Sequence, residues 1–121
     1  MKILIGKAGI DSKWRKEFDA KTVGNSIELV EDESQKDDCD YILYVVSPET
    51  QAVTPVVKAV NDSNFNTEKT IFCFLEEDES DKTFTSHQVK SLIATGKMIA
   101  RNGGKWFTSI DETIRFLSGQ A

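Results

Sequence analysis

Short hydrophobic runs recur along the chain, and each has the length of a β-strand. Two of them, Tyr41–Val46 and residues 70–75, are almost entirely apolar, which is typical of central parallel strands covered on both faces. Residues 2–6 form another buried run. The run around residues 27–30 is weaker and lies beside a polar stretch, so it suits a sheet edge. A short run at residues 106–107 is the fifth predicted strand.

The segment after the first run has a helical pattern. Asp11 or Ser12 can cap a helix there, and Trp14 and Phe18 share one of its faces at i, i+4 spacing. A helix with one aromatic face is therefore predicted to pack against the sheet.

A second helix is predicted after the central run. Thr54 is expected to be its N-cap and Pro55 its first residue, and the stretch from Asn61 to Asn66 is expected to end it. The predicted apolar stripe consists of Val53, Val56, Val57 and Val60.

Two further helices follow the fourth and fifth runs. Thr85 with Gln88, and Ser109 with Glu112, have the spacing of capping boxes, and Asn-Gly-Gly at residues 102–104 ends the longer helix. The predicted stripes are Val89, Leu92, Ile93, Gly96, Ile99 and Ala100 in the longer helix, and Ile110, Thr113, Ile114 and Leu117 in the last.

Strands and helices alternate except in residues 31–40, which have no convincing helical pattern. The pattern predicts an α/β fold with a single domain over residues 1–121. We expect a doubly wound, mostly parallel sheet of five strands in the order 2-1-3-4-5, with helices on both faces. In such sheets the ligand lies at the carboxyl ends of the strands where the order reverses, here between strands one and three. Residues 6–15 and 47–54 are predicted to line that site, with residues 75–78 beside them.

Composition narrows the range of partners. The chain has 121 residues and a formal net charge of −5, so it offers no basic surface to displace counterions from duplex DNA or RNA. No apolar stretch reaches the roughly 18 residues of a membrane span, and the amino-terminal residues lack a secretory signal pattern. We therefore expect a cytoplasmic protein that does not enter membranes or bind duplex nucleic acid.

Few side chains suit metal or cofactor chemistry. Cys39 and Cys73 form no C-x-x-C pair and are expected to be reduced strand residues. His87 has no neighbouring cysteine or second histidine, which argues against a zinc site. The phosphate-binding patterns G-x-G-x-x-G and G-x-x-x-x-G-K-[ST] are absent, because residues 6–9 fit neither spacing. We expect no metal and no cofactor, so any chemistry must rest mainly on carboxylates.

The charges near the predicted site favour an uncharged ligand. Acidic runs at residues 31–38 and 76–81 begin at the carboxyl ends of strands, where they would repel a polyphosphate. A receiver domain would need acids directly after strands one and three. Gly6-Lys7 and Ser47 occupy those positions, which excludes that class.

Asp11 and Glu49 are the candidate catalytic residues, because they follow neighbouring strands at the predicted site. Two carboxylates that flank a sugar can cleave a glycosidic bond, one as nucleophile and one as acid. Simpler roles stay open, since Asp11 can be a helix cap and Glu49 an exposed loop acid.

Other residues near this pair also have two interpretations. Trp14 can stack on a base or belong to the core, and Arg15 can hold a carboxylate or be solvated. Tyr44 is interpreted as a core residue and His87 as a surface residue.

Four segments, together with Trp14-Arg15, carry a family resemblance. They are residues 3–6 (ILIG), 39–49 (CDYILYVVSPE), 58–63 (KAVNDS) and 72–75 (FCFL). Together they resemble the small nucleoside 2-deoxyribosyltransferase-like proteins, several of which are encoded by phages. The resemblance extends over most of the chain.

The resemblance implies a flavodoxin-like, or Rossmann-like, fold that binds a nucleoside at the point where the strand order reverses. It also implies a glutamate nucleophile, on the helix after the central strand, that transfers 2-deoxyribose between bases. Lys58 stands near the position expected for that glutamate, and residues 55–60 contain no acid. A lysine cannot replace an anionic nucleophile at an oxocarbenium-like centre. Either Glu49 takes over from the preceding loop or catalysis is lost.

Two classes of function remain open from the sequence. One is an active transferase or N-glycosidase, in which Asp11 and Glu49 are the carboxylates, Ser47 binds the sugar and Trp14 supports the base. The other is a non-catalytic module of phage origin that binds a nucleoside or a related small molecule. Family members often complete their sites with a neighbouring subunit, so the resemblance also implies a homo-oligomer. The candidate substrate-binding residues are Gly6, Gly9, Ser12, Trp14, Arg15, Ser47 and Lys58.

Overall fold

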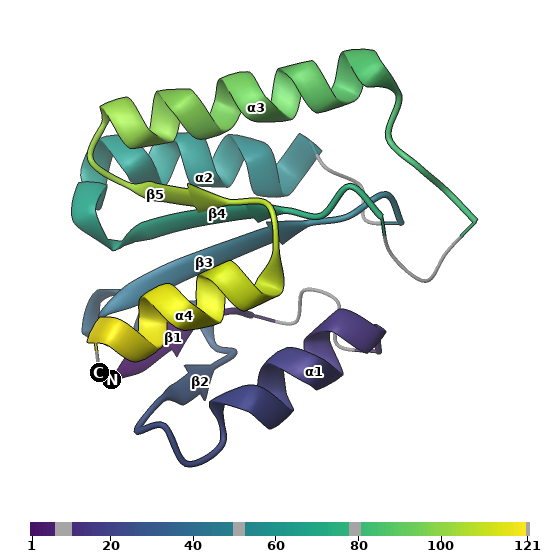
Figure 1. The fold of residues 1–121 in the computed structure, drawn as a ribbon. Helices are drawn as coiled ribbons and strands as arrows, with labels where there is room; N and C mark the ends of the chain where they lie inside the picture. The colour runs from purple at the N-terminus through teal and green to yellow at the C-terminus, as the bar shows by residue number, and fades with distance from the viewer. Residues whose placement is uncertain (7–10, 50–52, 78–80, 121) are drawn as a thin grey trace.

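The five strands form one sheet in the order β2-β1-β3-β4-β5, and every neighbouring pair is parallel (Figure 1). This computed structural model describes residues 1–6, 11–49, 53–77 and 81–120. The expected doubly wound, flavodoxin-like strand order is confirmed. The strands are β1 (Lys2–Leu4), β2 (Glu28–Val30), β3 (Tyr41–Val46), β4 (Thr70–Phe74) and β5 (Lys105–Phe107).

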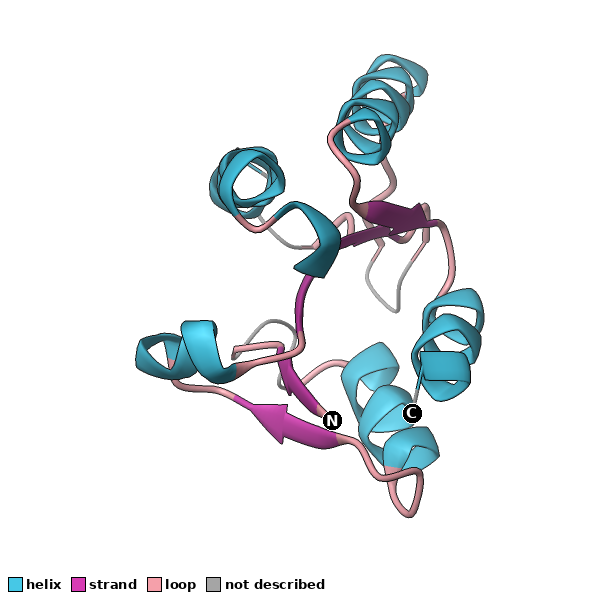
Figure 2. Cartoon of the chain, turned by 90° about the vertical axis from the view of Figure 1, so that its left-hand side faces the viewer, coloured by secondary structure: helices cyan, strands magenta, loops and turns pink. Residues whose placement is uncertain are grey.

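Helices cover both faces of this sheet (Figures 1 and 2). Helices α1 and α4 lie on one face, and α2 and α3 lie on the other together with a 3-10 helix, η1 (Figure 2). The helices are α1 (Lys13–Thr22), α2 (Val53–Phe65), α3 (Ser86–Arg101) and α4 (Ile110–Gln120), and the 3-10 helices are η1 (Glu33–Asp38) and η2 (Thr67–Lys69). Among the described residues, no helix is long and apolar enough to cross a bilayer.

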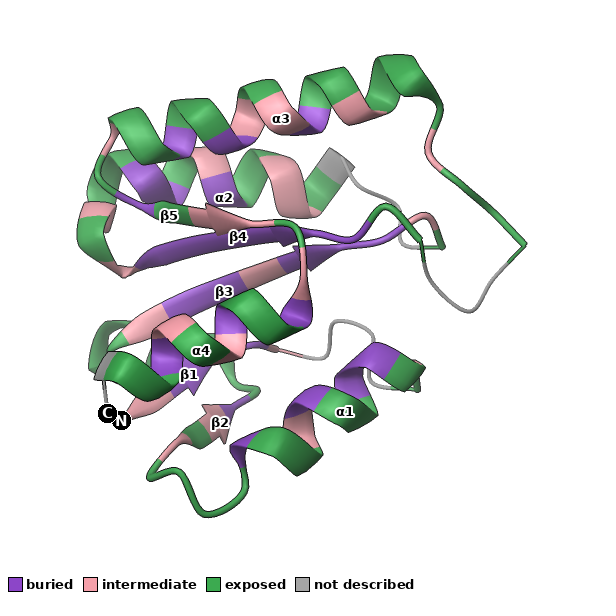
Figure 3. Cartoon of the chain, in the orientation of Figure 1, coloured by how far each residue is buried: buried purple, intermediate pink, exposed green. Residues whose placement is uncertain are grey.

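The two central strands are buried on both faces, as their continuous apolar runs predict (Figure 3). Successive residues of β4 point to opposite sides, so Ile71 and Cys73 join the core beneath α1 and α4. Phe72 and Phe74 join the core beneath α2 and α3. Each helix layer therefore has its own hydrophobic core, and the sheet lies between them.

The helix starts follow the local capping signals. Ser12, rather than Asp11, caps α1, because its hydroxyl accepts a hydrogen bond from the Arg15 amide at 3.2 Å. Thr85 and Gln88 form the complete capping box expected for α3. The Ser109 hydroxyl accepts from the Glu112 amide at 3.1 Å at the start of α4. These starts depend on residues close in sequence, so the sequence predicts them well.

Helix α2 differs from its prediction at both ends and in its buried face. It begins at Val53, so Thr54 lies inside it instead of capping it, and it continues to Phe65 through the polar residues. Val57 is 61% exposed, whereas Ala59 and Ser63 are buried. The valine stripe is therefore wrong at Val57, because packing against the sheet rotates the helix towards its smaller residues.

Contacts with distant residues explain why the polar end of α2 remains helical. The Asn102 side chain, at the end of α3, donates to the Ser63 hydroxyl at 3.0 Å and to the Asn64 side-chain oxygen at 3.3 Å. Buried polar groups are tolerated when they are hydrogen bonded. Residues that resemble a stop signal in isolation thus become part of the packing between two helices.

The stripe of α3 is largely as predicted. Leu92, Gly96 and Ile99 are buried, whereas Ala100 is exposed and does not belong to the stripe. At Gly96 a β-carbon would overlap the indole ring of Trp106 in β5. Glycine is therefore required for the close approach of α3 to the edge of the sheet.

Gly96→Leu should lower the free energy of unfolding by about 1–3 kcal/mol or more, because the added side chain must displace Trp106. Urea denaturation monitored by circular dichroism would measure the loss. Ala94→Leu, on the exposed side of the same helix, is the control and should change stability by no more than about 0.5 kcal/mol. Equal midpoints for the two variants would contradict this packing.

Candidate functional site

A cavity of about 170 Å³ opens between η1 and α2 at the reversal between β1 and β3. We call it the switch-point cavity. Its floor is formed by residues of β1 and β3, and Gly6 closes the end that follows β1. Glu33 of η1 lines one wall, and the other wall is formed by Thr54, Pro55 and Lys58 of α2.

The cavity exists because the connection from β2 to β3 contains a short 3-10 helix. Parallel strands are usually joined through an α-helix that covers the sheet. Here the six residues of η1 take that place, with Asp32 as the cap that accepts from the Ser34 amide at 2.9 Å. Part of the sheet between η1 and α2 is left uncovered and lines the cavity.

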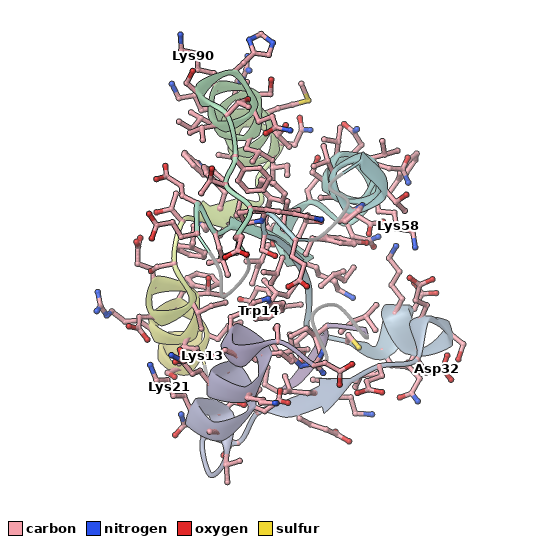
Figure 4. All side chains as sticks on the ribbon, turned by 90° about the vertical axis from the view of Figure 1, so that its right-hand side faces the viewer. Lys13, Trp14, Lys21, Asp32, Lys58 and Lys90 are labelled. Carbon is pink, nitrogen blue, oxygen red and sulfur yellow. The ribbon has the colours of Figure 1, made fainter. Side chains whose placement is uncertain are left out.

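Lys58 extends from α2 towards η1 (Figure 4). Its ammonium nitrogen lies 3.1 Å from a carboxylate oxygen of Glu33, and both residues line the switch-point cavity. The side chains are 48% and 72% exposed, so this ion pair contributes at most about 1 kcal/mol to stability. A ligand could therefore separate the pair at little cost and use either group.

A buried hydrogen-bond network connects three elements beside the cavity. Asp62 of α2 is 3% exposed and accepts from the Lys36 ammonium of η1 at 2.5 Å and from the Tyr44 hydroxyl of β3. Burial, and then the hydrogen bond to Asp62, raise the pKa of Tyr44. Tyr44, which lines the cavity, therefore keeps its proton at physiological pH.

The sequence reasoning missed this network, since Tyr44 was interpreted only as core and Asp62 as part of a helix stop. The sequence nevertheless contains a pattern that could have predicted these contacts. Thr54, Lys58 and Asp62 recur at intervals of four residues and so share one face of a helix. That polar face points towards the crossover between β2 and β3, where its partners lie.

A second cavity, of about 520 Å³, lies on the opposite face of the sheet near the carboxyl end of β4. It is lined by Trp14 of α1, by residues that follow β4 and by the start of α4. Trp14 is 8% exposed and packs in the same core cluster as Phe18, as one of its two interpretations expected. The sheet therefore separates Trp14 from the switch-point cavity.

Arg15 is not solvated, and the carboxylates that it holds belong to the protein itself. Its side chain is 3% exposed, and its guanidinium donates to the Gly6 carbonyl at 3.1 Å and to Asp19 at 3.0 Å. A third nitrogen lies 3.5 Å from a carboxylate oxygen of Glu31. These contacts tie the first turn of α1 to the ends of β1 and β2, so Arg15 positions the turn at Gly6.

The remaining candidates are distributed around the carboxyl edge of the sheet. Asp11 and Glu49 are exposed, Ser47 is buried and Ser12 caps α1, and none of them is among the lining residues of either cavity. Gly9 lies outside the described residues. Of the described candidates, only Gly6 and Lys58 line the switch-point cavity.

The described part of the chain contains no cluster of three or more metal-ligating side chains. Cys39 and Cys73 are both free and buried. Burial raises the pKa of the Cys73 thiol to about 12, so this sulfur stays protonated and unreactive at neutral pH. Polar chemistry at the switch-point cavity therefore rests on tyrosine, lysine, threonine and carboxylate groups.

Comparison with known proteins returned no matching family model, no matching curated protein and no matching solved structure. These comparisons therefore assign the chain to no family.

Tyr44→Phe tests the buried network through its pH dependence. At neutral pH it should lower the free energy of unfolding by about 1.5–3 kcal/mol, because it removes a hydrogen bond to a buried carboxylate. The folded pKa of Tyr44 is raised above its ordinary value of 10.0, so this contribution is present below pH 10 and is lost as the pH rises further.

The difference between wild type and Tyr44→Phe should therefore shrink above pH 10 by about 1.4 kcal/mol per pH unit. Urea denaturation at pH 8, 9.5 and 10.5 would measure it. A difference that stays constant over this range would show that Tyr44 ionises equally in the folded and unfolded chains.

Proposed function

We propose that the switch-point cavity binds a small uncharged molecule of the nucleoside class, and that the protein transfers deoxyribose inefficiently or not at all. The observation that supports this proposal is a cavity where the strand order reverses between β1 and β3, with an apolar floor and polar groups on its walls. Sites of this composition, placed at the reversal, are typical of ligand binding in doubly wound sheets.

The polar groups of the cavity suit a sugar or a base. Tyr44 and Thr54 offer hydroxyl groups, Lys58 offers donors and Glu33 offers acceptors. Glu33 lines one wall and belongs to the acidic run at residues 31–38, which disfavours a polyphosphate. A ligand with several hydroxyl or amide groups and no net charge satisfies both conditions.

The size of the cavity limits how much of the ligand can enter. Sites for drug-sized ligands usually measure about 300–1,000 Å³, whereas this cavity measures about 170 Å³. We infer that one ring, either the pentose or the base, enters the cavity and that the other stays at its rim. Binding would then be weaker than in a fully enclosing site.

The arrangement of charge supports slow or absent catalysis. Deoxyribosyl transfer needs an anionic carboxylate against the anomeric carbon, and α2 presents Lys58 to the cavity instead. The carboxylate that lines the cavity, Glu33, belongs to η1 and is paired with that lysine. Neither Asp11 nor Glu49 is among the lining residues.

A panel of deoxynucleosides and free bases, titrated into ¹⁵N-labelled protein, should shift amide resonances around Gly6, Tyr44 and Lys58. Thr54→Trp fills the wall of the cavity and should weaken that binding at least tenfold. Asn61→Trp, exposed on the same helix and outside the lining residues, is the matched control and should leave it unchanged. Shifts confined to the amino-terminal edge of the sheet would overturn the proposal.

Catalysis is tested separately, by incubating the protein with a deoxynucleoside and a second base and separating the products by chromatography. We expect no efficient base exchange. If exchange occurs, Glu49→Gln should lower kcat by several orders of magnitude and change binding far less, because the lost charge acts chiefly in the transition state. An unchanged kcat in Glu49→Gln would remove Glu49 from the reaction.

Lys58→Glu gives the complementary experiment, because it restores an acid near the position implied by the resemblance. It is best combined with Glu33→Gln, which removes the like charge that the new glutamate would face. Detectable exchange in the double variant, and none in Glu33→Gln alone, is the expected result. If neither Glu49→Gln nor the double variant alters activity, the carboxylate assignment is wrong.

A further inference from the structure

The cavity of about 520 Å³ beside α1 and α4 has the size of a small-molecule site, since such sites usually measure about 300–1,000 Å³. We call it the α1–α4 cavity. Helix α1 contributes Trp14 and Glu17, which lie three residues apart and so share a face of that helix. Glu76 and Glu77 follow β4, and Asp111 lies in the first turn of α4. None of the lining residues belongs to the switch-point cavity.

Trp14 presents an unused hydrogen-bond donor to this cavity. It is 8% exposed and lies on the side of α1 that faces the sheet (Figure 4). Its indole N–H donates to no acceptor in the part of the chain that the structure describes. The same residues contain no side-chain polar atom that is both enclosed and unpaired, so this N–H is open to solvent. Because Trp14 lines the cavity, an acceptor for its N–H has to come from a molecule within the cavity.

The charged side chains that line the α1–α4 cavity are all acidic. Asp111 is paired with Lys21 at 2.6 Å, and Lys21, which also attracts Glu17 more weakly, lies outside the lining. Glu17, Glu76 and Glu77 form no salt bridge with a described residue. The amino end of α4 adds a partial positive charge, which the acidic residues of its first turn offset. The cavity therefore favours a cation.

The spacing of the carboxylates indicates which kind of cation fits. Among the described residues, no group of three or more is close enough to hold a metal ion. Carboxylates spread around a cavity of this size instead suit an organic cation whose amino groups are separated by a small carbon framework. The free donor of Trp14 adds a second condition, because the same ligand has to carry an acceptor such as a hydroxyl oxygen.

We propose that the α1–α4 cavity binds a polyhydroxylated diamine of the aminocyclitol or amino-sugar class. Its ammonium groups face Glu17 on one side and Glu76 and Glu77 on the other, and a ring hydroxyl accepts from the Trp14 indole N–H. This would be a second ligand site, on the opposite face of the sheet from the switch-point cavity, and it takes a ligand of different charge.

Three small rings separate the two conditions. 2-Deoxystreptamine carries ammonium and hydroxyl groups, cis-1,3-cyclohexanediamine carries only the ammonium groups, and myo-inositol carries only hydroxyls. In titrations of ¹⁵N-labelled protein, 2-deoxystreptamine should bind at least threefold more tightly than the diamine and at least tenfold more tightly than myo-inositol. It should shift the indole N–H resonance of Trp14 and leave that of Trp106, which packs on the other face of the sheet, in place.

Matched charge variants locate the site. Glu76→Gln combined with Glu77→Gln should weaken 2-deoxystreptamine binding at least fivefold. Glu28→Gln combined with Glu68→Gln removes the same charge from exposed positions outside the lining and should change binding less than twofold. All four side chains are exposed, so neither pair should disturb the fold. Trp14→Phe should lower the affinity for 2-deoxystreptamine to that of the diamine and leave diamine binding unchanged.

Four results would overturn the proposal of a diamine site. They are an unmoved Trp14 indole resonance at millimolar 2-deoxystreptamine, equal binding of myo-inositol, equal losses in the two double variants, or displacement of 2-deoxystreptamine by an equal concentration of Mg²⁺. The last result would assign the carboxylates to a metal ion. Because the two cavities share no residue, nucleoside binding at the switch-point cavity can fail while these titrations succeed, and the reverse.

Discussion

The short crossover between β2 and β3 is the constraint on which the candidate site depends. The crossover must pass over β1 to place β3 on its other side, and it does so with η1 rather than with an α-helix. A 3-10 helix of six residues rises only about 12 Å and has a narrow surface to bury. The sheet beneath it consequently packs a small separate cluster of Leu4, Val30, Cys39 and Ile42, and the gap beside α2 forms the cavity.

The hydrogen bonds of Asp62 to Lys36 and Tyr44 compensate for the small surface with which η1 covers the sheet. A buried carboxylate is costly unless its oxygens are satisfied, and here each oxygen accepts from a different element. Lys36 connects it to η1 and Tyr44 connects it to β3, so the crossover is held against α2 where little apolar contact is available. The same bonds orient the Tyr44 side chain at the cavity, so the packing of the crossover and the lining of the cavity depend on one arrangement.

Charge divides the α2 and α3 side of the molecule into two surfaces with different chemistry. Around η1 the acidic run at residues 31–38 places Glu33 in the wall of the switch-point cavity. The exposed charged side chains of α2 and α3 are all cations. Helix α2 contributes to both surfaces, through Lys58 on one side and Val57 on the other.

The sequence by itself determined the elements whose signals are local. The continuous apolar runs located β3 and β4, the capping residues located α3 and α4, and their alternation predicted the strand order. These features depend on the spacing of hydrophobic residues along the chain and on capping hydrogen bonds within a single helical turn. Both involve residues that are close in sequence, so the sequence alone reveals them.

Only the tertiary structure decided which faces and partners those elements use. Asp62 meets Tyr44 and Lys36 at separations of 18 and 26 residues, so no local pattern could identify the network. Arg15 is buried by contacts with Gly6 and Glu31, and its own helix could not show which carboxylate it holds. The sheet likewise placed Trp14 and Lys58 on opposite faces, because the chain reverses its direction across the sheet after β2, so α1 before the reversal and α2 after it pack on different sides.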